Sequence, residues 1–324
     1  MIFYLILVLV IAAFFTYMIY MPGVSYQGAL PSLDDADRAM AERLESHVSM
    51  LCSNPAGRNY IEKQGLISAK QYITERFQAS GYPVSFQEYQ ISGDTFANIA
   101  TQSTGTTRPE EIIVIGAHYD AVIGSPGAND NGTGVAAMLE LADLLRDRQF
   151  PRTVRFVAFT NEEPPNFMTI NMGSYHYAKR TAAHKEKIIA MFSLETIGYY
   201  SDKHGSQHYP PSLGFFYPDR GNFIAFVGNL GSRPLVTRAI QLFREHATFP
   251  SEGIAAPSFV PGIGWSDHWS FWKQGYPAIM VTDTAPFRYP DYHSAHDTPD
   301  KVDYIKMVYV VKGMQKVIEV FLDR

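Results

Sequence analysis

The sequence predicts a three-layer α/β/α fold, in which helices cover both faces of a central mixed, mostly parallel sheet. Two observations favour this fold class. Short runs rich in Val, Ile and Phe, such as 112–116 and 154–160, lack polar alternation, which is typical of strands buried on both faces. Segments with helical spacing of apolar residues separate these runs, as expected for strands that are joined by crossover helices.

The expected elements follow in order along the chain. Two helices, over 34–51 and 66–78, come first, and strands at 84–91 and 97–102 follow. The alternating part then predicts strands at 112–116, 154–160, 188–194, 223–227 and 278–282, and helices at 132–146, 173–182, 233–246 and after Val302. Residues 200–222 are too rich in Pro and Gly for regular structure, and we expect them to form an insertion that shapes a pocket.

The N-terminal stretch Ile2–Met21 contains no charged residue. As a helix of about 1.5 Å rise per residue it would span roughly 30 Å, so we expect residues 1–21 to be a transmembrane anchor. A cleaved signal peptide and a buried core helix are the alternatives. Residues 22–33 read as a linker and 34–324 as one catalytic domain. The first basic residue is Arg38, so the orientation is weakly specified, and we expect the domain on the extracytoplasmic side.

Composition excludes several classes of protein. The formal net charge is −5 and no basic block is present, which argues against a nucleic-acid partner. Cys52 is the single cysteine, so an internal disulfide and a zinc ribbon are both impossible. Any bound metal must therefore use His, Asp and Glu ligands, which are typical of catalytic zinc.

Five polar segments follow predicted strands or lie in nearby loops. Ligands in open α/β sheets bind at the carboxyl ends of strands, where these segments are expected to meet. Each segment has an ordinary structural explanation when taken alone, such as a helix N-cap, a solvated acidic loop or a salt bridge. The segments are GAHYD (116–120), GANDNGTG (127–134), TNEEPP (160–165), SLETIG (193–198) and YHSAHDTPD (292–300).

Together, these segments would bring several acids to one edge of the sheet. Such acids repel one another unless cations lie between them, and two divalent metals would keep them ionised. A carboxylate has two oxygens and can bridge two cations, which is the role we expect for Asp130. Glu162 and Glu163 are neighbours and point in different directions, so one can ligate metal while the other faces a water molecule. Asp120 could fix the tautomer of His118.

These motifs, with SDHWSFW (266–272), resemble those of the bacterial leucyl-aminopeptidase type of co-catalytic zinc peptidase over about residues 50–320. The resemblance implies two Zn²⁺ ions per chain, a peptide substrate and hydrolysis of N-terminal peptide bonds. It implies a cis peptide bond after Asp130 and a general-base role for Glu162. The implied metal ligands are His118 and Glu195 for one zinc, Glu163 and His293 for the other, and Asp130 for both.

The sequence departs from the family pattern at two positions. Many members have Asp where Glu195 stands, and several have a tyrosine that binds the oxyanion where Ile263 stands. His268 is one candidate for that missing role. We expect Asp267 and His268 to contact substrate or to support the ligands, and we do not expect His296 to be a ligand.

Three alternative functions stay open. A glutaminyl cyclase would use the same scaffold with a single zinc. A glutamate-type carboxypeptidase would need an arginine cluster at its pocket, for which Arg220 and Arg288 are available. A catalytically silent ectodomain would usually have lost ligands, and none is missing here.

Overall fold

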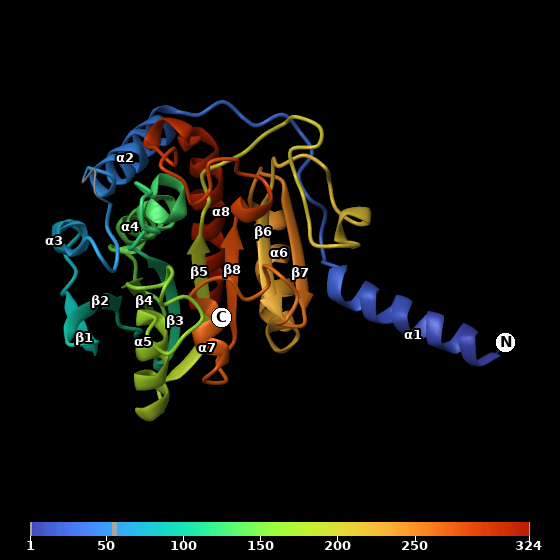
Figure 1. Cartoon of the computed structure of the whole chain (residues 1–324), viewed down its shortest axis with the longest axis horizontal. Helices are drawn as coiled ribbons and strands as arrows, with labels where there is room; N and C mark the ends of the chain where they lie inside the picture. The colour runs from blue at the N-terminus through green and yellow to red at the C-terminus, as the bar shows by residue number, and fades with distance from the viewer. Residues whose placement is uncertain (1, 54–56, 324) are drawn as a thin grey trace.

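The computed structural model describes residues 2–53 and 57–323 of the 324-residue chain. Its centre is a sheet of eight strands in the order β1-β2-β4-β3-β5-β8-β6-β7 (Figure 1). The strands are β1 (Ser85–Ile91), β2 (Asp94–Ser103), β3 (Arg108–His118), β4 (Arg152–Phe159), β5 (Lys187–Glu195), β6 (Ile224–Asn229), β7 (Ser251–Ala256) and β8 (Ala278–Thr282).

The sheet is mixed, as the sequence predicted. Strand β3 pairs in parallel with both β4 and β5, and β5 pairs in parallel with β8. Strands β6 and β7 are parallel to each other, but β6 runs antiparallel to β8. The carboxyl ends of β3, β4, β5 and β8 therefore meet the amino ends of β6 and β7 at one edge of the sheet.

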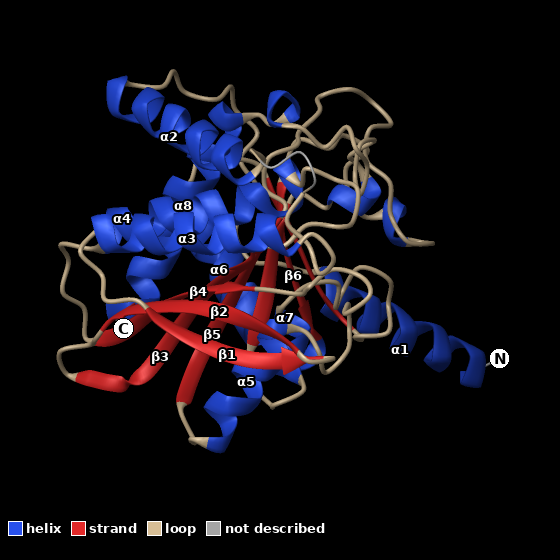
Figure 2. Ribbon diagram, turned by 60° about the vertical axis from the view of Figure 1, so that its left-hand side comes forward, coloured by secondary structure: helices blue, strands red, loops and turns tan. Residues whose placement is uncertain are grey.

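Helices cover both faces of the sheet, which makes the fold three-layered (Figure 2). On β3, Ile113 and Ile115 pack in a large core with α2, α3, α4, α6 and α8, whereas Ile112 and Val114 pack in a second core with α5 and α7. The helices are α1 (Ile2–Ile19), α2 (Asp35–Leu51), α3 (Lys63–Ala79), α4 (Gly134–Leu145), α5 (Gly173–Ala183), α6 (Arg233–His246), α7 (His268–Trp272) and α8 (Tyr304–Asp323).

The N-terminal helix corrects one prediction. Helix α1 has 18 residues and projects from the body of the protein, but it ends at Ile19 rather than Met21 (Figure 1). Met18 and Met21 are buried against the body, so the end of the apolar stretch is used for packing. Within the described residues, no helix combines the length and apolar character that crossing a bilayer requires, and the expected transmembrane helix is not found.

Candidate metal centre

The predicted ligands come from three neighbouring strands and two loops. His118 is the last residue of β3 and Glu195 the last of β5, while Glu162 and Glu163 follow the end of β4. The chain leaves β3 toward β4 on one side and leaves β5 toward β6 on the other, so the direction of the connections reverses between β3 and β5, where ligands of α/β sheets usually bind. Asp130 comes from the loop before α4, and His293 from the loop after β8.

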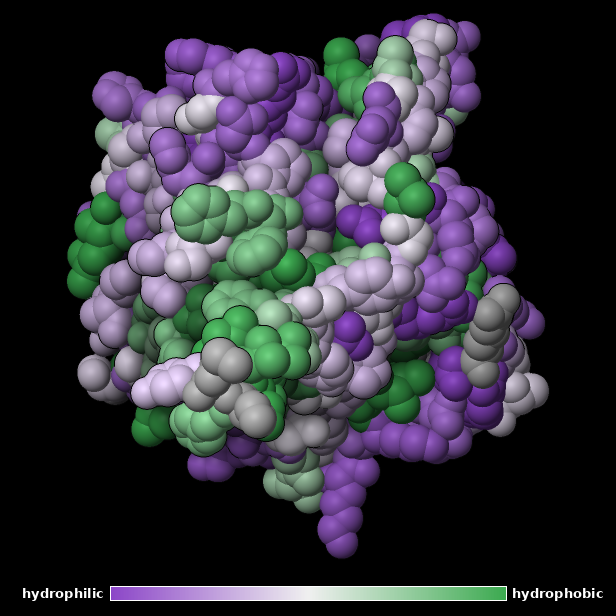
Figure 3. Space-filling view, turned by 90° about the vertical axis from the view of Figure 1, so that its right-hand side faces the viewer, coloured by the Kyte–Doolittle hydropathy of each residue, from purple (hydrophilic) through white to green (hydrophobic). Residues whose placement is uncertain are grey.

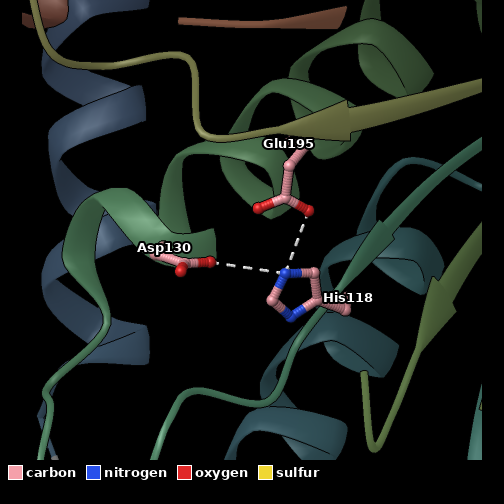
Figure 4. Close-up of side chains that lie close together, drawn as sticks. All are labelled: His118, Asp130 and Glu195. Carbon is pink, nitrogen blue, oxygen red and sulfur yellow. Dashed lines mark ion pairs between the residues drawn. The ribbon is translucent and has the colours of Figure 1, made fainter. Parts of the chain in front are cut away.

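The five residues form two groups that share one carboxylate. In the first, His118 Nε2 lies 3.1 Å from Glu195 Oε2 and 3.4 Å from Asp130 Oδ1 (Figure 4). In the second, His293 Nε2 lies 3.0 Å from Asp130 Oδ2 and 3.3 Å from Glu163 Oε2. The ligand atoms of each group lie within 4.8 Å of one another. Asp130 therefore directs one oxygen into each group.

Three atoms of these groups are buried and accept or donate no hydrogen bond among the described residues. They are His118 Nε2, Asp130 Oδ1 and Glu163 Oε1. Buried polar atoms in proteins are nearly always partnered, and imidazole nitrogens with carboxylate oxygens are the donors that catalytic zinc uses. The donor set and its unpartnered atoms fit a divalent metal in each group.

Burial strongly perturbs the protonation of the cluster. It raises the pKa of Glu163 to about 7 and the pKa of Glu162 well above its usual range. Burial lowers the pKa of His293, but its hydrogen bonds to Asp130 and Glu163 raise it to about 10. Both imidazole rings lie beside carboxylates of the cluster. A divalent cation between these groups would be the largest local charge and would keep the acids ionised.

Asp120 orients three of the predicted site residues at once. Its two carboxylate oxygens accept hydrogen bonds from the backbone N–H groups of Glu162, at 3.2 Å, and Glu163, at 3.1 Å. Its Oδ1 also lies 3.5 Å from His118 Nδ1, and its carbonyl oxygen lies 3.2 Å from that nitrogen. These contacts turn His118 Nε2 toward the metal groups, which agrees with the predicted tautomer role of Asp120.

The loop that carries Asp130 is held by residues that the sequence analysis missed. Asp297 Oδ1 and Oδ2 accept hydrogen bonds from the backbone N–H groups of Asn129, at 2.8 Å, and Asp130, at 3.1 Å. The fully buried Arg58 donates to the carbonyl oxygens of Pro126 and Gly127. The peptide bond after Asp130 is cis, as the resemblance implied. Asp297 lies within the HDTPD motif, whereas no local pattern marks Arg58.

The three residues of the SDH segment, Ser266, Asp267 and His268, have different contacts. Ser266 Oγ donates a 2.6 Å hydrogen bond to Glu195 Oε2, so it supports a ligand. Asp267 is buried, and burial raises its pKa to about 7. His268 is also buried and lies outside both groups, with Nε2 2.8 Å from the carbonyl oxygen of Ile263. Burial lowers the pKa of His268 to about 4, so this imidazole is neutral.

His296 is exposed and belongs to neither group, as expected from the sequence.

An apolar cavity of about 90 Å³ lies beside the candidate metal centre. Glu195 and Tyr292 line it on the side of the metal groups. The ring of Tyr292 stacks on His293 at 3.8 Å between centroids. Burial raises the pKa of Tyr292 well above its usual range, and the charges of Asp130 and Glu163 raise it further. Tyr292 therefore lies between the ligand His293 and the cavity, a placement that the sequence analysis missed.

Comparisons with known proteins agree with this geometry. Residues 98–317 match the model of peptidase family M28. The chain is 39% identical over 305 residues to the uncharacterized protein YfbL of Escherichia coli, with 91% of each chain covered.

Two solved structures share the fold at low identity. An aminopeptidase from Aneurinibacillus sp. strain AM-1 has a TM-score of 0.64 and 18% identity, covering 86% of this chain and 93% of its own. A glutaminyl cyclase from Fimbriiglobus ruber has a TM-score of 0.63 and 19% identity, covering 93% of this chain and 99% of its own. The family resemblance inferred from the motifs is confirmed: this chain belongs to peptidase family M28.

Proposed function

We propose that this M28 peptidase is a zinc-dependent aminopeptidase, which releases the N-terminal residue of a peptide at a site for two Zn²⁺ ions. The observation that supports it most directly is the pair of three-residue groups that share Asp130. His118 and Glu195 would hold one ion, His293 and Glu163 the other, and Asp130 would bridge them. The buried unpartnered atoms of the cluster support these assignments.

Glu162 is the proposed general base. Its Oε2 lies 3.9 Å from His118 Nε2, and it belongs to neither ligand group, so its carboxylate lies beside the first group and would be free to act as a base. When bound, the zinc ions would polarise the scissile carbonyl and lower the pKa of the attacking water. Glu162 takes the proton of that water and later delivers it to the leaving amine. Burial raises the pKa of Glu162, which suits both transfers.

Tyr292 is the proposed donor to the developing oxyanion. Ile263 occupies the position of the family's tyrosine and has no polar side-chain atom, and His268 is engaged with the carbonyl of Ile263. Tyr292 stacks on the proposed ligand His293 and also lines the cavity. A hydroxyl donor there would stabilise negative charge on the carbonyl oxygen.

The alternative functions receive less support. A glutaminyl cyclase with one zinc would need one ligand group, and here both groups are complete. A glutamate-type carboxypeptidase needs cations at its pocket, yet the described residues lining the cavity include no Lys or Arg. Arg288 is buried and donates to Gln207 and to the carbonyl of Phe223. Arg220 is partly exposed and lies beside His204.

The test of this function uses the full-length protein in detergent, loaded with zinc. We expect hydrolysis of aminoacyl arylamides and two zinc ions per chain. A chelator should abolish the activity, and added zinc should restore it.

Glu162→Gln should lower kcat by about 10²- to 10⁴-fold while both ions stay bound. Glu88→Gln, the same change at an exposed site on β1, should have no effect. Full activity of the Glu162→Gln protein would exclude the general-base role, and cyclisation of glutaminyl peptides without arylamide hydrolysis would exclude the aminopeptidase.

We also propose that α1 associates the chain with a membrane, with the catalytic domain on the extracytoplasmic side. Helix α1 is uncharged, and large apolar side chains along it are exposed, including Phe3, Val8 and Val10. Figure 3 shows hydrophobic surface gathered on the side from which α1 projects. Exposed apolar surface of this extent marks an interaction site. Val8→Asp with Val10→Asp should move the full chain from the membrane fraction to the supernatant, and unchanged fractionation would contradict the proposal.

A further inference from the structure

The floor of the apolar cavity is a row of four residues on neighbouring strands. Glu195 of β5 pairs with Thr282 of β8, Thr282 pairs with Ala225 of β6, and Ala225 pairs with Glu252 of β7. All four line the cavity, so they share one face of the sheet. Since neighbouring strands lie about 4.8 Å apart, the row spans about 14 Å between the Cα atoms of the two glutamates.

The middle of this row is uncharged. Thr282 and Ala225 have short side chains, so they leave open space between the two carboxylates. Above the row, Tyr209, Leu213, Tyr217 and Phe287 provide apolar walls. Both tyrosine hydroxyls are already engaged, with the carbonyl oxygens of Pro218 and Gly253. The space therefore suits an unbranched aliphatic segment that lies along the row.

Glu252 is the member of the row at the end away from the metal groups, and it forms an ion pair with Arg244. Arg244 Nη2 lies 3.6 Å from Glu252 Oε2, which is too long for a hydrogen bond. Arg244 instead donates to the carbonyl oxygens of Ser251 and Pro22. Among the described residues, no donor forms a hydrogen bond with the carboxylate of Glu252. Burial raises the pKa of Glu252 and the charge of Arg244 partly offsets this rise, so the carboxylate has a nearby cation but can still accept hydrogen bonds.

We propose that this row selects peptides whose N-terminal residue is lysine or arginine. The inference rests on the proposed aminopeptidase function and names its substrate class. The α-amino group and scissile bond lie in the acidic metal cluster, the aliphatic stem lies over Thr282 and Ala225, and the terminal cation meets Glu252. Lysine has a flexible four-carbon stem that ends in a compact ammonium, which matches an apolar channel that ends in a carboxylate.

The experiment compares lysine, arginine, norleucine and leucine arylamides on the zinc-loaded full chain. Norleucine has the carbon chain of lysine without the ammonium, so the ratio of the two kcat/KM values isolates the charge. We expect the wild type to prefer lysine over norleucine. Glu252→Gln should lower kcat/KM for lysine by about tenfold or more, because a hydrogen bond to a charged group is lost, and leave norleucine within about twofold.

Two further variants keep the test decisive. Glu252→Asp keeps the charge beside Arg244 and should retain part of the lysine preference, while Glu88→Gln should retain all of it. Norleucine hydrolysis reports that each variant is folded. A lysine-to-norleucine ratio that is the same in wild type and Glu252→Gln would overturn the inference and leave the aminopeptidase standing. A wild type that hydrolyses none of the four substrates would overturn the proposed function as well.

Discussion

The two proposed metal groups share Asp130 but differ in what supports their remaining ligands. His118 and Glu195 end two neighbouring strands of the sheet, and the His118 side chain is 0% exposed. His293 and Glu163 lie in loops, and the His293 side chain is 32% exposed. Glu195 also accepts a hydrogen bond from Ser266, whereas His293 is supported by the ring of Tyr292.

One cluster can therefore combine a rigid half, here the group with His118 and Glu195, and an adaptable half, here the group with His293 and Glu163. Ligands on strand ends are held by the sheet ladder and by packing, which preorganises a site. Ligands on loops depend on fewer fixed contacts, and loop segments open locally at lower free energy. We therefore expect the group with His118 to bind its ion more tightly than the group with His293.

The largest expected effect comes from removing the residue that both groups share. Asp130→Asn should release both zinc ions and lower kcat/KM by at least about 10³-fold, because Lewis-acid stabilisation of several kcal/mol is lost. Zinc content per chain and arylamide hydrolysis measure this. Asp147→Asn, at an 87% exposed side chain, is the matched control. Full retention of one ion would show that the two halves are independent and that Asp130 does not bridge them.

Tyr292 tests whether the adaptable half contributes to chemistry as well as to metal binding. Tyr292→Phe keeps the ring that stacks on His293 and removes only the hydroxyl. We expect kcat to fall about 10²-fold, as for the loss of one oxyanion donor, with two zinc ions still bound. Tyr26→Phe on the linker segment provides the control. An unchanged kcat would mean that the oxyanion is stabilised elsewhere.

Chelator competition compares the two halves directly. We expect the zinc ions to leave in two steps, with affinities about tenfold or more apart, because supporting contacts typically change metal affinity by that factor. His293→Ala should remove the weaker step and leave one ion bound. If both ions leave in one step, or if the remaining ion of His293→Ala is the weaker one, the comparison is wrong.

The smallest effect should come from weakening the rigid half. Ser266→Ala removes the hydrogen bond to Glu195 and should lower affinity in the tighter step about tenfold, so that the two halves become more alike. Ser68→Ala on the exposed face of α3 should leave both steps unchanged. Equal affinities in Ser266→Ala and wild type would show that the strand ends alone support the tighter site.

The sequence predicted those parts of the molecule that local patterns specify. Buried strands such as β3 and β8 have continuous apolar runs, and the polar residues that follow them mark the ligand-bearing edge. Strand β7, SEGIAA, was missed because it has a single β-branched residue and includes a glycine. Helix α7 was missed because its five residues are too few to show helical periodicity.

Residues whose roles depend on long-range packing could not be predicted. Arg58 reaches carbonyl groups more than 60 positions away, at Tyr119, Pro126 and Gly127. Glu252 faces the cavity only because β7 pairs in register with β6. The end of the N-terminal helix depended on Met18 and Met21 packing against the body, which hydropathy alone does not reveal. The length of the uncharged stretch Ile2–Met21 therefore did not predict that the helix ends at Ile19.

Because β6 and β7 run opposite to β8, changes that affect substrate preference can occur apart from changes that affect the metal ligands. Strands β3, β5 and β8 bring their carboxyl ends to the metal edge, while β6 and β7 bring their amino ends there. The segments that enter β6 and β7 can therefore acquire insertions or substitutions without shifting any proposed zinc ligand. Substrate preference can diversify among relatives on this side of the sheet while the hydrolytic chemistry stays constant on the other.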